Sequence, residues 1–309
     1  MEKDSKSRNK ALIFISIAIV GSGLSSTFIE LGLNSIPSVP FLFYRFAISM
    51  ILITPLILVK KRDQVVNLFK KKFVWLIGIF EGLGLILQYL GQELQIPAGL
   101  ATLLTITYAL MVPFFSWFLL KQQLKVYHLI AVITSIVGIF FIISEGNLTF
   151  LISSSFSLIG IIILILSAVF LGLYITFTSF IQKLHDNNLD SFSLFYCTLV
   201  IISLFSMLIM IITGQYVIPP QDSWIWLLSL VLFSTIIAFY MYFMSMKTLN
   251  ANQVSLLLLL QVIVPFAIDI FLFGRNYNIW VLIGSIILFM SVFLSTLISL
   301  KSHKNDVKI

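Results

Sequence analysis

Long apolar runs, separated by short polar or charged clusters, extend along almost the whole chain. A helix that crosses a hydrocarbon core about 30 Å thick needs about 20 apolar residues, because lipid offers its backbone no hydrogen-bond partners. Cutting the runs at charges, prolines and polar clusters gives ten segments of about that length. The pattern therefore predicts transmembrane helices at 11–30, 38–59, 73–94, 97–119, 125–143, 158–181, 191–212, 224–246, 251–273 and 278–299.

The composition agrees with a protein whose surface mostly faces lipid. Hydrophobic residues make up 60% of the chain and charged residues only 10%, with a mean hydropathy of +1.09. A soluble domain carries about a quarter charged residues, because its surface must be wetted. The net charge of +7 comes from clusters between apolar runs, without interleaved aromatic residues. This pattern is typical of membrane flanks and argues against nucleic-acid binding.

Reactive side chains are few. The chain has one cysteine, Cys197, and three histidines that lie far apart in the sequence. A lone cysteine excludes an internal disulfide and a CxxC redox pair, and no metal-ligand spacing occurs. We therefore expect no metal, no cofactor and no catalytic residues.

The distribution of lysine and arginine predicts the orientation. If the N-terminus is cytoplasmic and all ten segments span, all but two of the 19 Lys and Arg residues fall on the cytoplasmic side. Only Arg275 falls outside, and Arg45 lies within a segment. Cytoplasmic flanks carry such an excess of positive charge. The sequence thus predicts a multi-pass protein of the cell (inner) membrane with cytoplasmic tails at 1–10 and 300–309.

The chain contains an internal repeat. Leu-Phe-Tyr at 42–44 recurs at 194–196, and Pro113 recurs as Pro265, in both cases 152 positions later. This offset maps the first five segments onto the last five. Since five is odd, the second copy must cross the membrane in the opposite sense, which is the symmetry of alternating-access transporters. The predicted fold is an all-α integral membrane protein of two inverted five-helix repeats. These repeats are 11–143 and 158–299.

Several motifs are similar to those of the EamA-type transporters of the drug/metabolite transporter superfamily. They are Gly21-Ser22, Tyr44-Arg45-Phe46, Pro97-Ala98-Gly99-Leu100-Ala101-Thr102, Tyr108 with Val112-Pro113, and Ile136-Val137-Gly138-Ile139. The chain departs from the family where Leu-Gly-Glu appears as Leu120-Lys121-Gln122 and, in the second copy, as Phe273-Gly274-Arg275. The resemblance covers about 11–299. It implies a central cavity lined by helices 1, 3, 4, 6, 8 and 9, and export or exchange of metabolites, amino acids or drugs.

Glu81 is the first candidate for a functional charge. It lies about eight residues into the third segment, near the midplane, and Gln88 and Gln92 follow on the same helical face. An ionisable group in hydrocarbon costs about 2.5–3.5 kcal/mol, so it needs an explanation. One hypothesis is that Glu81 binds a cationic or amine group of the solute, or exchanges a proton against it. A structural pair and a passive vestibule position are the alternatives.

Arg45 and Asp269 are the other charges within segments. Counting from the helix ends places both in the outer half of the bundle, at comparable depths. An ion pair between them, or between Arg45 and another helix end, could clamp the outer face closed. Because Arg45 lies on a helix that the resemblance does not include among those lining the cavity, a structural role is favoured over gating.

Polar side chains also form weaker stripes on other segments. Serine and threonine in membrane helices usually bond their own backbone or pack against neighbours, so each residue alone is a weak signal. The candidates for solute binding on these stripes are Thr105, Tyr108, Tyr174, Thr178, Tyr242 and Gln261.

The sequence predicts a secondary transporter, an exporter or exchanger of small metabolites such as amino acids, amines or drugs, with proton coupling left open. The alternative is a non-transporting membrane scaffold or sensor built on the same fold. An enzyme is not expected, because no nucleophile–base pair, metal triad or suitably spaced carboxylate pair is evident. The expected partners are a small-molecule solute and the lipid bilayer, without nucleic acid. A ten-helix bundle can enclose a path alone, so we expect a monomer.

Overall fold

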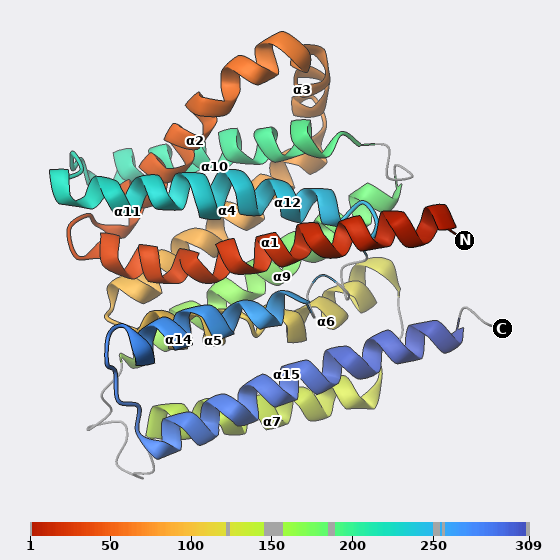
Figure 1. Ribbon diagram of the computed structural model, residues 1–309, viewed down its shortest axis with the longest axis vertical. Helices are drawn as coiled ribbons and strands as arrows, with labels where there is room; N and C mark the ends of the chain where they lie inside the picture. Colours follow the sequence, from red (N-terminus) through yellow and green to blue (C-terminus); the bar gives the residue numbers. More distant parts are fainter. Residues whose placement is uncertain are drawn as a thin grey trace.

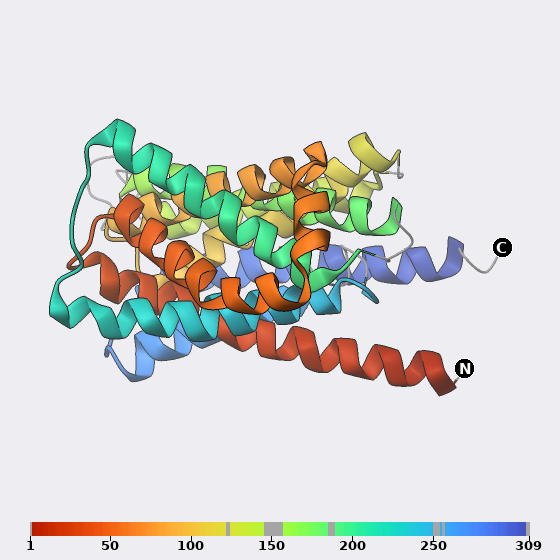
Figure 2. The ribbon, with the colours of Figure 1, turned by 90° about the horizontal axis from the view of Figure 1, so that it is seen from above.

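Helices lie side by side in one bundle (Figures 1 and 2). The computed structural model describes residues 2–121, 124–144, 157–184, 189–249, 254 and 257–306, which contain helices and no strands. The first half contains α1 (Glu2–Leu33), α2 (Ser38–Lys60), α3 (Arg62–Phe69), α4 (Lys72–Glu93), α5 (Ala98–Thr105), α6 (Tyr108–Leu120) and α7 (Val126–Ser144). The second half contains α9 (Leu158–Leu184), α10 (Ser191–Thr213), η1 (Gln221–Ser223), α11 (Trp224–Ser229), η2 (Leu230–Ile237), α12 (Ala238–Ser245), η3 (Leu259–Val262), α14 (Ile263–Phe271) and α15 (Ile279–Asp306).

Helical stretches coincide with the apolar runs of the sequence. Within the described residues, seven stretches are long and apolar enough to cross a membrane, and three apolar stretches are shorter. The seven are Asn9–Leu33, Ser38–Lys60, Lys72–Glu93, Ala98–Leu119, Leu158–Gln182, Ser191–Thr213 and Gln221–Ser245; the shorter three are Val126–Ile142, Leu259–Phe271 and Ile279–Ser295. Every predicted segment overlaps one of these stretches, although 251–253 and 255–256 of the ninth segment lie outside the described residues.

Three features differ from the predicted segments. First, α1 begins at Glu2 and α15 continues to Asp306, so the predicted tails are helical wherever they are described. Second, α3 was not predicted, because its eight residues are too short and too polar for a span. Its Val65 and Leu68 lie three positions apart and are both buried, as on one face of a surface helix.

Third, two predicted spans are irregular at their centres. The fourth is divided into α5 and α6, and at the division the Thr107 hydroxyl donates to the carbonyl oxygen of Leu104 at 2.7 Å. The eighth contains η2, a π-helical stretch in which the Thr235 hydroxyl donates to the carbonyl oxygen of Leu230 at 2.9 Å. Such local bonds compete with the regular helical ladder. The hydrophobic pattern of the sequence is continuous through both places, so it could not predict either irregularity.

The two ends of the bundle differ in charge. α1 begins and α15 ends at the same end, which also carries α3 (Figures 1 and 2). We call it the basic end, because it holds Lys60, Lys61, Arg62, Lys70, Lys71 and Lys72 around α3. We call the opposite end, where α14 meets α15, the Arg275 end. Among the described residues, Arg275 is the only lysine or arginine there.

The helices pack in pairs that join the two halves. α4 of the first half packs on α9 of the second half. The equivalent contact with the halves exchanged is that of α12 and η2 with α1. α2 packs on α10, α5 on α14, and α7 on α15. If the two halves are exchanged, the contact of α4 with α9 becomes that of α12 and η2 with α1. Each of the other three pairs becomes itself. The packing is therefore that of two related halves facing each other.

Two close contacts give the spacing of the repeat. Gly23 on α1 lies against the backbone of Gln261, and Gly172 on α9 lies against the backbone of Tyr108. The glycines are 149 positions apart, and their partners are 153 apart. The number of residues between equivalent positions therefore differs from helix to helix. The single offset of 152 expected from the sequence is approximate.

Candidate functional site

A central cavity of about 110 Å³ lies between the two halves. It is lined by α1, α2, α4, α5, α6, α9, η2, α12 and the stretch around η3. One ordered water needs roughly 10–15 Å³ of such space, so the cavity can hold several waters or a small organic solute. The cavity agrees with the set of lining helices implied by the family resemblance, with α2 in addition.

Equivalent positions of the two halves meet in this cavity. Residues of α1 and α9 face it in pairs 149 positions apart, and other residues face it in pairs 153 apart. The pairs are Ser22 with Leu171, Ser25 with Tyr174, Ser26 with Ile175, Glu81 with Ser234, Thr105 with Leu258, and Tyr108 with Gln261. The cavity therefore lies between equivalent parts of the two halves. The first half supplies most of its polar side chains.

Most of the residues predicted to bind solute line the cavity. These are Glu81, Gln88, Thr105, Tyr108, Tyr174, Tyr242 and Gln261. Gln92 and Thr178 do not line it. Gln92 is buried, and its Nε2 donates to the carbonyl oxygen of Ser26 at 3.4 Å. Thr178 is fully buried on α9, one turn beyond Tyr174.

Among the described residues that line the cavity, Glu81 supplies the only carboxylate. α4 presents it together with Leu85 and Gln88, at helical spacings of four and seven. Its side chain is 2% exposed, and Oε2 has no hydrogen-bond partner. The carboxyl group faces the Tyr174 hydroxyl and interacts electrostatically with Arg45. A buried charge with so few partners needs a ligand or a proton to complete its surroundings.

Arg45 is the second charge in the cavity wall, 1% exposed. Its Nε donates to Thr235 Oγ1 at 2.7 Å, and Nη1 donates to the Tyr89 hydroxyl at 2.9 Å and to Ser25 Oγ at 3.3 Å. Nη2 donates to the carbonyl oxygen of Ser234, in η2, at 3.3 Å. All these partners are neutral. Arg45 is thus held firmly in place while its charge is left to be balanced across the cavity.

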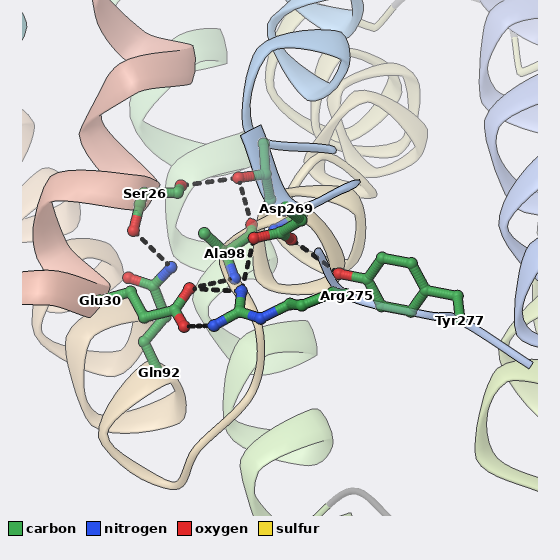
Figure 3. Close-up of polar contacts among 9 residues, drawn as sticks. Ser26, Glu30, Gln92, Ala98, Asp269, Arg275 and Tyr277 are labelled. Carbon is green, nitrogen blue, oxygen red and sulfur yellow. Dashed lines mark hydrogen bonds and ion pairs between the residues drawn. The ribbon is translucent and has the colours of Figure 1, made fainter. Parts of the chain in front are cut away.

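The predicted ion pair between Arg45 and Asp269 is wrong. Asp269, at the end of α14, contacts Arg275 and Tyr277 instead (Figure 3). Counting residues from the helix ends gives the depth of a side chain but not the direction in which it points. Arg45 faces the cavity, whereas Asp269 is fully buried near the Arg275 end and does not line the cavity.

Among the described residues of the cavity wall, four buried polar atoms have no hydrogen-bond partner. They are Glu81 Oε2, the hydroxyls of Tyr108 and Tyr242, and Ser234 Oγ. Leaving a buried polar group unpaired costs about 1–3 kcal/mol. Beside them the rings of Tyr174 and Tyr242 stack with centroids 6.0 Å apart. The wall therefore offers a cluster of hydrogen-bond acceptors next to aromatic surface.

Some residues of the wall were not singled out from the sequence. Ser25 and Ser26 on α1 line the cavity, as does Ser234 in the π-helical stretch. Ser22, Ser25 and Ser26 share one helical face at spacings of three and four, which is the signal that could have found the α1 residues. Nothing in the local sequence marks Ser234, whose position depends on the π-helix. Among the described residues, no group of three or more His, Cys, Asp and Glu could hold a metal ion.

A half-buried ion pair joins the two halves at the basic end. Lys61 Nζ lies 3.2 Å from Asp190 Oδ1. Asp190 also caps α10, accepting from the Ser193 amide at 2.9 Å and its hydroxyl at 2.7 Å. Burial acts to raise the pKa of Asp190, but the bonds from Ser193 and Lys61 outweigh it and hold this pKa below its ordinary value.

Replacing Asp190 by alanine is expected to lower the free energy of unfolding by about 1 kcal/mol, as for other lost N-caps. Asparagine still accepts from the Ser193 amide, so Asp190→Asn should retain most of this stability. Because the pKa is depressed in the folded protein, the charge contributes stability above the ordinary carboxyl pKa of about 4. That contribution is lost as the pH falls through the folded pKa. Thermal unfolding of the purified variants in detergent, between pH 3 and 7, measures both effects; equal stability of the alanine variant and the native protein would refute the cap.

Comparison with known proteins places the chain in a family. The profile of the EamA-like transporter family matches residues 9–144 and again residues 158–297. A solved structure described only as "Crystal structure of protein" shares the fold, with a TM-score of 0.66 at 15% identity over 95% of this chain and 98% of that one. The curated proteins contain no match. The two matches cover both halves of the bundle and the whole cavity wall, and the chain belongs to the EamA-like transporter family.

Proposed function

We propose that this protein is a secondary transporter that moves small amine-bearing solutes across the cell membrane by alternating access. The family is one of transporters, and the cavity supplies the chemistry of a solute site. The observation that carries the proposal is Glu81, a buried carboxylate with an unpartnered oxygen in the cavity wall. Under this proposal the central cavity binds the solute, and Glu81 holds its amino group.

The proposed arrangement in the membrane is ten spans in two inverted five-helix repeats. The exchanged packing of the halves and the equivalent positions in the cavity support it. The basic end is assigned to the cytoplasm, because cytoplasmic flanks are rich in lysine and arginine. Both ends of the chain then lie in the cytoplasm, and the Arg275 end becomes the outer end.

The cavity fits a primary ammonium group. Such a group has three N–H donors, and Glu81 Oε2 with the hydroxyls of Tyr108, Tyr242 and Ser234 supplies unpartnered acceptors. The stacked rings of Tyr174 and Tyr242 add a surface that attracts cations. Polar atoms and aromatic rings of the cavity wall can thus bind the same ammonium group.

The fixed charge of Arg45 limits which amines fit. Its guanidinium is buried in the same wall and makes hydrogen bonds only to neutral groups. With Glu81 ionised the wall carries one positive and one negative charge. It therefore favours a solute with one ammonium group, or a zwitterion whose carboxylate faces Arg45, over a solute with several positive charges.

Glu81 can also couple transport to protons. A carboxylate that holds an ammonium group cannot at the same time hold a proton, so the two compete. If a proton occupies Glu81 whenever the solute does not, then each ammonium group moved one way is exchanged for a proton moved the other way.

Uptake and efflux in proteoliposomes test this function. Purified protein is reconstituted, and monoamines, neutral amino acids, diamines and carboxylic acids are compared at pH 6 and pH 8. The expected result is flux of monoamines or neutral amino acids that changes with pH, with little flux of diamines or simple acids. Binding of an amine without any flux would support the scaffold or sensor alternative. Flux limited to solutes without an amino group would refute the proposed site.

A further inference from the structure

A partly buried cluster of charged groups joins the helices at the Arg275 end of the bundle (Figure 3). Arg275 lies in the segment between α14 and α15, and both oxygens of Glu30, at the end of α1, accept from its guanidinium. Its Nη1 also donates to Asp269, at the end of α14. The Tyr277 hydroxyl donates to Asp269 Oδ2 at 2.7 Å. One arginine thus joins α1 of the first half to α14 of the second.

The same two carboxylates also hold the beginning of α5. Glu30 Oε2 accepts from the amide of Ala98, and Asp269 Oδ2 accepts from the amide of Gly99, both at 2.8 Å. The first amides of a helix have no partner within the helix and favour negative charge. Two carboxylates therefore share one guanidinium and two helix-terminal amides. We call Glu30, Ala98, Gly99, Asp269, Arg275 and Tyr277 the outer latch.

The outer latch is mostly shielded from water. The side chain of Asp269 is fully buried, that of Glu30 is 18% exposed and that of Arg275 is 29% exposed. Bidentate pairs between arginine and carboxylate are among the strongest charge-assisted hydrogen bonds. Opening the bundle at this end would separate α1 and α5 from α14, and so would break the bonds of the latch that join the two halves.

Among the described residues of the basic end, the two latch carboxylates have no charged equivalents. With the offset of 149 found at the cavity, Glu30 corresponds to Ser179, and with the offset of 153, Asp269 corresponds to Ser116. Both serines are buried. The ion pair between Lys61 and Asp190 at that end is 31% and 27% exposed and joins other helices. Surface pairs of this kind contribute little. Two identical inverted halves would close either end with the same free energy, but these halves differ.

The latch is also connected to the cavity wall through α5. The Thr102 hydroxyl lies 2.8 Å from the carbonyl oxygen of Ala98, one turn away, and 2.6 Å from Ser26 Oγ. Ser26 and Thr102 both line the cavity, and Gln92 donates to the carbonyl oxygen of Ser26 (Figure 3). Ser26 and Thr102 thus link the cavity wall to the beginning of α5.

From these observations we infer that the outer latch is the outer gate of the transporter, and that it biases the resting protein toward the state closed at the Arg275 end. The bias follows from the absence of matching charges at Ser116 and Ser179. The solute site signals to the gate through Thr102 and the beginning of α5. This inference rests on the proposed arrangement as an alternating-access transporter.

Thiol labelling from each side of the membrane tests the gate. Thr105 lines the cavity, and its hydroxyl bonds only its own helix, at the carbonyl oxygen of Ala101. The native Cys197 is fully buried and is replaced by serine. Thr105→Cys in this background is labelled with a membrane-impermeant maleimide, in right-side-out and in inside-out vesicles. Arg275→Gln and Glu30→Gln are then added singly, with Lys61→Gln as the matched control at the basic end.

A gate predicts reciprocal changes in the two labelling rates. Each latch variant should raise labelling from outside about tenfold, which corresponds to about 1.4 kcal/mol of lost bias, and should lower labelling from inside. Lys61→Gln should leave outside labelling unchanged. Increased labelling from both sides in both latch variants would indicate general loosening and would overturn the inference, as would unchanged labelling. Labelling needs no solute. The test therefore gives a result for the gate whether or not the protein transports amines.

Discussion

Replacing Glu81 by glutamine is expected to lower amine transport at least a hundredfold and to abolish its pH dependence between pH 5 and 8. Glutamine has nearly the same shape, but its amide carries no charge and exchanges no proton. Charge-assisted bonds contribute about 1.5–3 kcal/mol, which corresponds to roughly ten- to hundredfold in affinity, and the loss of proton exchange adds to this. Uptake of a transported amine in proteoliposomes, at fixed membrane potential, measures the effect.

Glu93→Gln is the matched control for this substitution. Glu93 lies on the same helix, twelve residues after Glu81, and does not line the cavity. Its Oε2 accepts from the amide of Ser38 at 3.4 Å, a bond that glutamine can retain. The control should transport nearly as well as the native protein. If Glu81→Gln transported equally well with an unchanged pH profile, Glu81 would be a passive position and the proposed site would be wrong.

Replacing Arg45 by leucine is expected to lower the free energy of unfolding by about 3–5 kcal/mol, which is the usual cost of leaving a buried charge uncompensated. The substitution leaves the hydroxyls of Tyr89 and Ser25 and the carbonyl oxygen of Ser234 without their donor. It also leaves the charge of Glu81 uncompensated. Thermal unfolding in detergent, with intrinsic fluorescence as the signal, measures the loss.

The double variant Arg45→Leu with Glu81→Gln separates these two causes. If the two charges balance each other across the cavity, the double variant should be more stable than Arg45→Leu alone. A loss equal to the sum of the two single losses would show that they do not interact. Arg62→Leu is the matched control, because Arg62 is exposed on α3 at the basic end and its loss should change stability by less than about 0.5 kcal/mol.

The fold could be predicted from the sequence as far as hydrophobic runs specify helices. All ten segments overlap helical stretches, and the repeat that relates Pro113 to Pro265 appears in the family match to both halves. α3 could not be found by searching for long runs, and the π-helical η2 could not be found by any regular period. In η2 the Thr235 hydroxyl donates to the carbonyl oxygen of Leu230, five residues earlier, a local bond that the hydrophobic pattern does not reveal.

Helical spacing could predict which face of a single helix is polar. Glu81 and Gln88, which this spacing puts on one face of α4, both line the cavity. The spacing could not predict how helices are rotated relative to one another. Hence Gln92 falls outside the cavity, Arg45 falls inside it, and Asp269 pairs with Arg275 rather than with Arg45.

Charge provides a similar contrast. The excess of lysine and arginine at one end follows directly from the sequence once the spans are known. The outer latch does not, because Glu30, Asp269 and Arg275 come from segments far apart in the chain. Glu30 stands at the end of an apolar run, where a carboxylate normally marks a solvated boundary, and only its contacts give it another meaning.

Protection of a cavity cysteine by solute tests the central claim most directly, namely that one site between the two halves is reached from both sides. Thr105→Cys in the Cys197→Ser background is labelled from each side of the membrane, with and without an amine that the native protein transports. The account predicts labelling from both sides, slow from outside, and protection by the amine on either side at the same site affinity. Labelling from one side alone, or labelling that the transported amine does not slow, would contradict it.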